Sequence, residues 1–182
     1  MLHEGEEVRV EIPHWGRFSS YVSYANQVGT GQAPIVGGLF LGSDAVSSLK
    51  DTSRFPVTQD QRNTARARLR FQVAHRLWFA TGGQYGSGLP VDTGADPNLL
   101  LAQYGPTILD QVNLARGRIK PNYALDVAAG LEVYRKEQRS ATLQIQAANL
   151  TDHVNVINFA SLFSGTAVAA PRNISTRLKL TF

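Results

Sequence analysis

The chain of 182 residues contains no cysteine and no long run of apolar residues. Without cysteine, a disulfide framework and a thiolate metal site are both excluded. No segment approaches the ~18 consecutive apolar residues of a membrane-spanning helix. The first ten residues, MLHEGEEVRV, have neither the basic start nor the apolar stretch of a signal peptide. We therefore expect any export signal to lie outside this chain.

The chain is also poor in charge, since only 18% of its residues are charged. A net charge of +4 and an isoelectric point of about 9.6 are compatible with an acidic partner. A soluble nucleic-acid binder usually carries more charge, so we expect no nucleic-acid partner. The four histidines share no ligand spacing, and we expect no metal site. They are His3, His14, His75 and His153.

Motifs for catalysis or phosphate binding are equally scarce. The run GTGQAPIVGG, from Gly29 to Gly38, lacks the Gly-Lys-Ser/Thr ending of a phosphate-binding loop and reads as an ordinary loop. No Ser, His and Asp cluster is visible, so we expect no enzyme, no catalytic residue and no cofactor. Helix is expected only in short turns, for example from Ser43 to Leu49.

Alternation of apolar and polar residues is what the sequence does have, and it is typical of β-strands with two different faces. The predicted fold class is therefore all-β, with antiparallel strands. Seven strands are predicted, at Glu7–Ile12, Arg17–Ala25, Thr64–Ala74, Leu77–Gly86, Asn122–Arg135, Ser140–Leu150 and Asn173–Phe182.

The connectors between these strands alternate in length. The short ones are Pro13–Gly16, His75 with Arg76, and Lys136–Arg139; the long ones are Asn26–Asn63, Ser87–Pro121 and Thr151–Arg172. Transmembrane β-barrels have short periplasmic turns and long extracellular loops, which alternate along antiparallel strands. Every short turn falls on the side of the C-terminus, which favours one polarised barrel wall.

The number of predicted strands indicates whether this chain could form a complete barrel. Bacterial single-chain barrels have an even number of strands, at least about eight, whereas this chain has seven. We therefore expect residues 1–182 to form a single partial domain. It would be the C-terminal six or seven strands of a larger transmembrane barrel, as a sheet that is open at both edges.

Several stretches then point to one family. They are FPVTQDQRNTARARLRF (Phe55–Phe71), QYGSGLP (Gln84–Pro90), GRIKPNYALDVAAG (Gly117–Gly130), NLTDHVNVINFASLFSGT (Asn149–Thr166) and the terminal PRNISTRLKLTF, which ends at Phe182. In this order they resemble the C-terminal barrel of TonB-dependent outer-membrane receptors. The resemblance covers roughly Val10–Phe182.

The resemblance implies a barrel of about twenty-two strands with a plug domain in its lumen. It implies energised uptake of iron chelates, cobalamin or glycans across the outer membrane of a Gram-negative-type bacterium. This chain lacks a plug and a TonB box, so it would not transport alone and would reach TonB only through the missing plug. The implied partners are outer-membrane lipid, the barrel-assembly machinery, the missing N-terminal strands and the plug.

The alternation and the resemblance together assign roles to particular side chains. Apolar faces would meet lipid and polar faces would line the lumen, while aromatic residues would lie at the membrane interfaces. The lumen would contain a cationic column that either contacts an anionic partner or remains a solvated strand face. The expected lipid-facing residues are Leu125, Val127, Leu131, Leu143 and Ile145; the interface aromatics are Phe79, Tyr85 and Tyr123; the cationic column is Arg66, Arg68 and Arg70; and the membrane-insertion strand carries Leu178, Leu180 and Phe182.

Two other classes of protein fit parts of the sequence. A small soluble β-barrel or sandwich that binds a ligand would turn the apolar strand faces inward, toward a shared core. A hydrolase on a β scaffold has no supporting motif. The orientation of the apolar faces separates the first class from the membrane protein.

Overall fold

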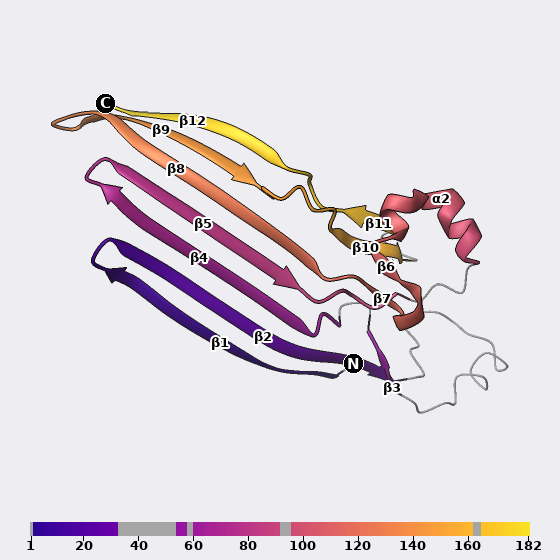
Figure 1. Cartoon of the computed structure of the whole chain (residues 1–182). Helices are drawn as coiled ribbons and strands as arrows, with labels where there is room; N and C mark the ends of the chain where they lie inside the picture. Colours follow the sequence, from indigo (N-terminus) through magenta and orange to yellow (C-terminus); the bar gives the residue numbers. More distant parts are fainter. Residues whose placement is uncertain (1, 33–53, 58–59, 92–95, 162–164) are drawn as a thin grey trace.

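The computed structural model describes residues 2–32, 54–57, 60–91, 96–161 and 165–182. Its main feature is an antiparallel sheet in the order β1-β2-β4-β5-β8-β9-β12 (Figure 1). These strands are β1 (Leu2–Trp15), β2 (Phe18–Gln32), β4 (Asn63–Ala74), β5 (Leu77–Gly86), β8 (Asn122–Lys136), β9 (Arg139–Ala148) and β12 (Asn173–Thr181). A short strand, β3 (Arg54–Pro56), pairs with the end of β2. The predicted open, seven-stranded antiparallel sheet is confirmed.

Short hairpins join the strands at one end of the sheet, and the long connectors gather at the opposite end (Figure 1). Gly16 has a φ of +61° in the first hairpin, a left-handed conformation that glycine adopts without strain. The sorting of connectors by length is thus as predicted. Strands β1 and β2 extend well beyond Glu7–Ile12 and Arg17–Ala25, because their backbone ladder continues to the pair Leu2 and Thr30 after the apolar alternation has ended.

The long connectors contain regular structure that the sequence did not predict. They form a helix, α2 (Pro97–Leu109), a 3₁₀ turn, η1 (Leu114–Arg116), and two small hairpins. The hairpins are β6 (Val112–Asn113) with β7 (Arg118–Ile119), and β10 (Val156–Ser161) with β11 (Gly165–Val168). We refer to α2, β6, η1, β7, β10 and β11 as the loop cap.

The expectation of helix only in short turns is wrong, because α2 has 13 residues. The Asp96 side chain caps its start by accepting a hydrogen bond of 2.7 Å from the Asn98 N–H, and Pro97 provides a helical φ at the first position. A kink follows at Gly105, with a φ of +77° just before Pro106. The short helix predicted for residues 43–49 lies outside the described residues.

The buried apolar cluster of the described chain lies in the loop cap. Its members are Leu100, Val112, Ile119, Val156 and Phe159. Leu100 anchors the helix, and the ring of Tyr104 packs against that of Phe159 at a centroid distance of 4.9 Å. Among the described residues, no helix has both the length and the hydropathy needed to cross a membrane.

Candidate functional site

One face of the sheet is apolar from edge to edge. The register aligns Leu131, Leu143 and Leu178 in one row across β8, β9 and β12. Further along, Phe18, Phe71 and Phe79 form a row across β2, β4 and β5. The remaining members of this apolar face include Val8, Val10, Ile12, Val22, Leu69, Leu125, Val127, Ile145, Ile174 and Leu180.

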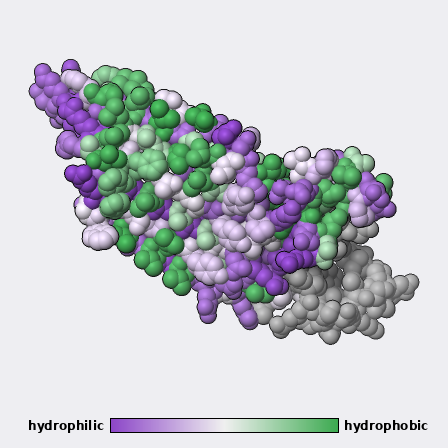
Figure 2. All heavy atoms as spheres, in the orientation of Figure 1, coloured by the Kyte–Doolittle hydropathy of each residue, from purple (hydrophilic) through white to green (hydrophobic). Residues whose placement is uncertain are grey.

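None of the described elements covers this apolar face, so its side chains are open to the surroundings. Leu178 is 60% exposed, Ile145 is 51% exposed and Leu131 is 42% exposed. In Figure 2, hydrophobic residues gather over the strands, and hydrophilic residues collect at the tip formed by the hairpin turns. The five residues expected to face lipid share this face.

Aromatic side chains lie near both limits of the apolar face. Tyr85 and Tyr123 are directly opposed on β5 and β8 at the loop end. Beyond this row polar side chains enter the face, and the Tyr24 hydroxyl donates a hydrogen bond of 2.7 Å to Oδ1 of Asn63. Phe79 lies toward the hairpin end. Between Tyr123 and Tyr134, β8 covers roughly 36 Å.

The terminal strand β12 forms one edge of the sheet. It pairs with β9 along its whole length, from Asn173 opposite Ala148 to Thr181 opposite Ser140. Leu178 and Leu180 lie on the apolar face, and Phe182 follows the strand with 90% of its surface exposed. The three residues expected to guide membrane insertion therefore form an accessible apolar edge at the hairpin end.

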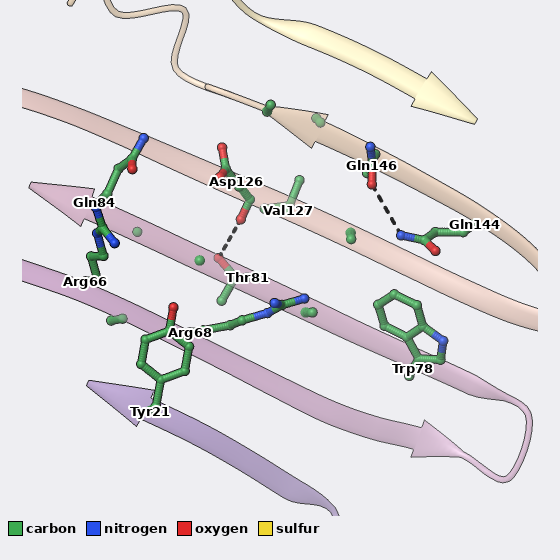
Figure 3. Close-up of a pocket in the computed structure, with 17 residues that line it drawn as sticks. Tyr21, Arg66, Arg68, Trp78, Thr81, Gln84, Asp126, Val127, Gln144 and Gln146 are labelled. Atoms are coloured by element: carbon green, nitrogen blue, oxygen red, sulfur yellow. Dashed lines mark hydrogen bonds between the residues drawn. The ribbon is translucent and has the colours of Figure 1, made fainter. Parts of the chain in front are cut away.

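The opposite face of the sheet is polar and carries the arginine column. Arg66, Arg68 and Arg70 project from alternate positions of β4, and all three are exposed. Their surroundings differ. Arg70 lies over the ring of Trp78, with Cζ 4.4 Å from the ring centroid. Arg66 and Arg68 instead line a hollow of about 380 Å³ in the middle of the face (Figure 3).

Trp78 lies flat against the polar face because the position across from it is a glycine. Gly130 is its partner on β8, and a Cβ built on Gly130 would lie 2.4 Å from the indole ring. With Gly130 beneath the indole and the guanidinium of Arg70 over it, the indole has a defined position. It closes the hairpin end of the hollow.

A buried carboxylate ties the first long connector to the second. Asp60 has a fully buried side chain. Its Oδ1 accepts a hydrogen bond of 2.9 Å from the Gly29 N–H, and its Oδ2 contacts Arg62 at 3.3 Å and Nη2 of Arg118. Nη1 of Arg118 donates to the carbonyl oxygens of Asp60, at 3.0 Å, and of Gly88, at 2.9 Å. One guanidinium therefore holds both connectors.

Burial alone would raise the pKa of Asp60. The hydrogen bond from Gly29 and the guanidinium groups of Arg118 and Arg62 outweigh burial and lower the pKa below its ordinary value. Asp60 is consequently charged at neutral pH, and its charge is compensated on two sides.

The third connector attaches to the sheet through Asn155. Its side chain donates to the carbonyl oxygen of Tyr123 and accepts from the Tyr123 N–H, each at 2.9 Å, so it imitates a neighbouring strand. The ring of His153 stacks on that of Tyr123 at a centroid distance of 3.8 Å. Within the part of the chain that is described, no three His, Asp or Glu side chains come together as a metal site would require.

Sequence reasoning missed Asp60, Arg118 and Trp78. Asp60 sits in the polar run TQDQRN, which looks like any solvated loop, and Arg118 is 58 residues away. For Trp78 a signal existed: alternation places it on the polar face, and a glycine occurs in the strand that pairs with it. Searches of protein-family models, curated proteins and solved structures find no match for the chain. The resemblance to TonB-dependent receptors stays a prediction.

Proposed function

We propose that this chain is the C-terminal barrel wall of an outer-membrane receptor of the TonB-dependent type. Such a receptor takes up large substrates such as iron chelates, cobalamin or glycans, and this part of the wall would not transport on its own. The observation that carries the proposal is a sheet whose apolar face is uncovered while its opposite face bears arginines and glutamines.

The apolar face favours lipid as its neighbour. Removing apolar surface from water contributes about 25 cal/mol per Å², and large hydrophobic side chains on every long strand of the sheet are more than a third exposed. A soluble sandwich would bury this face against a second sheet, and none of the described elements does so. Lipid supplies the missing contact, with the aromatic residues at the two interfaces.

The direction of the edge strands defines the partner that would complete the wall. Strands β1 and β12 both run from the loop end to the hairpin end, because they are the first and the seventh of seven strands, each antiparallel to the next. An antiparallel wall that joins them must contribute an odd number of strands. A second copy of this sheet also contributes seven strands. Its long loops would have to lie at the same end as those of the first copy, however, and each edge strand of the second copy would then run parallel to the edge strand that it joins. An odd number of strands from the rest of a receptor would pair with both edges in antiparallel fashion.

The proposed function also implies the remaining partners. Leu178, Leu180 and Phe182 form the accessible edge that the barrel-assembly machinery would engage. The polar face would surround a plug domain, and the plug would provide the contact with TonB. The protein would reside in the outer membrane of a Gram-negative-type bacterium.

Quenching by brominated lipid tests this proposal on adjacent residues. Tryptophan is placed at Ile145 or at Gln146, on opposite faces of β9, with both native tryptophans replaced by phenylalanine. In brominated vesicles, we expect strong quenching of the Ile145→Trp variant and little quenching of the Gln146→Trp variant. Equal quenching of both variants, or a monodisperse folded monomer in detergent-free buffer, would refute the membrane function and favour a soluble ligand-binding β protein.

A further inference from the structure

The hollow on the polar face has the size of a small-molecule site. Its volume of about 380 Å³ falls within the ~300–1,000 Å³ typical of ligand pockets. Side chains from β2, β4, β5, β8 and β9 line it (Figure 3). Its floor is low because Ala80, Gly82 and Ala128, in the middle of β5 and β8, have little or no side chain. A ligand could therefore approach the sheet backbone closely.

The charge around this hollow is unbalanced toward positive. Arg66 and Arg68 stand on one wall, roughly 7 Å apart along β4. Neither makes an ion pair with any described residue. Asp126 is the single carboxylate of the lining, and its Oδ1 already accepts a hydrogen bond of 2.9 Å from the Asn149 N–H. Figure 3 shows Arg66 directed toward Gln84 and Arg68 extending along the hollow toward Trp78.

The other wall offers neutral hydrogen-bonding groups. Gln144 and Gln146 project from β9, and Nε2 of Gln144 donates to Oε1 of Gln146 at 3.3 Å. This pairing orients both amides and leaves further donors and acceptors free for a ligand. Tyr21 adds a hydroxyl beside the arginines. Guanidinium groups recognise carboxylate or phosphate, whereas paired amides suit the vicinal hydroxyl groups of a polyol.

We propose that this hollow binds a small polyhydroxylated anion, with Arg66 and Arg68 holding its carboxylate or phosphate group and Gln144 and Gln146 holding its hydroxyl groups. The inference rests on the proposed function, in which the polar face lines the lumen around the plug domain. Trp78 borders the hollow and reports its occupancy through fluorescence.

The test is a titration of the 182-residue chain carrying Trp15→Phe, refolded in micelles of an amine-oxide detergent that contains no sugar. The probes are glucuronate, glucose 6-phosphate and glucose, which share a pyranose ring but differ in charge. We expect at least one of the two anions to bind at least about tenfold more tightly than glucose, and the ratio of the two anions identifies the preferred oxyanion. Replacing both arginines, as Arg66→Ala with Arg68→Ala, should weaken anion binding about tenfold or more.

Lys179→Ala is the matched control. Lys179 is a cation on β12 that lies on the polar face of the sheet, like the two arginines, but outside the hollow. It should leave anion binding unchanged. If the double variant does not refold, the single variants Arg66→Gln and Arg68→Gln are titrated instead. Failure of both anions to bind the folded chain at ~10 mM would overturn the inference. Equal weakening by Lys179→Ala would also overturn it, since binding would then follow overall charge. If the chain folds without detergent, the proposed function fails. The same titration in buffer then tests separately whether the hollow binds the anions.

Discussion

On the sheet, Ile145 and Leu178 each expose more than half of their surface, whereas Val156 and Phe159 in the loop cap expose 3% or less. The sheet is held by backbone ladders along long strands, and its apolar face depends on what surrounds the protein. The cap buries its own apolar side chains, and its Arg118 pairs with the buried carboxylate of Asp60. The same chain thus contains a part whose stability depends on the solvent and a part that carries its own core.

The largest expected effect separates the cap from the sheet. Phe159→Ala removes a buried ring that packs on Tyr104, and such truncations cost about 3–5 kcal/mol. In micelles, hydrogen exchange should accelerate across α2, β10 and β11 and change little in β4 and β5. Ile157→Ala is the control, since Ile157 lies on the same strand and is 49% exposed. Uniform acceleration throughout the sheet would show that the two regions unfold as one unit.

The two faces of the sheet should differ in how well they tolerate an added charge. Leu143→Arg places a charge on the apolar face, where arginine costs about 2–4 kcal/mol at the middle of a bilayer. Gln144→Arg, one residue along, places the same charge on the polar face. Refolding yields in lipid vesicles should fall for the first variant and stay near the parent value for the second. A second pair of variants, Val127→Arg on the apolar face and Gln72→Arg on the polar face, should behave in the same way. Similar losses for both members of a pair would mean that both faces are packed.

A pH dependence should be confined to the surroundings of the buried Asp60 carboxylate. Because the pKa of Asp60 is lower in the folded chain than in the unfolded chain, its contribution to stability is present above the ordinary aspartate pKa of about 3.9. This contribution is lost as the pH falls through the lower, folded value. Asp60→Asn should remove this pH dependence of hydrogen exchange near Gly29 and Gly88, and should cost about 1.5–3 kcal/mol at neutral pH.

Asp110→Asn is the matched control for Asp60. Asp110 also pairs with a cation, Lys120, at 3.2 Å, but its side chain is 71% exposed. Exposed pairs contribute little, so its removal should leave exchange unchanged. If the two variants behaved alike, the Asp60 contact would be an ordinary surface pair.

The smallest effect on folding is expected at the end of the chain. Phe182 is 90% exposed, so its deletion should cost well below the about 1.5–3 kcal/mol of a fully buried side chain. If the barrel-assembly machinery engages this edge, deletion should still lower the amount of receptor in the outer membrane without changing synthesis. Phe182→Tyr keeps an interfacial aromatic and should be nearly silent. If the amount of receptor in the outer membrane is unchanged after the deletion, β12 is a strand of the sheet with no special part in membrane insertion.

The seven strands and the sorting of their connectors were predictable from the sequence, as were the two faces of the sheet. The reason is that alternation with period two is a local property of the sequence. The strand face on which Leu131 or Leu143 lies follows from its own neighbours in the chain, whichever strand pairs with it. The register of strand pairing then places the apolar residues of neighbouring strands on the same face of the sheet.

Only the tertiary structure revealed the loop cap, the Asp60 and Arg118 contact, and the hollow beside Trp78. The helix α2 lacks a clear amphipathic repeat, and its burial depends on β10, which lies about fifty residues later in the chain. The hollow depends on register, since Ala80, Gly82 and Ala128 form a floor only once β5 and β8 are paired. Such contacts join residues that are distant in sequence, so no local pattern encodes them, whereas the strand faces follow from the geometry of the backbone itself.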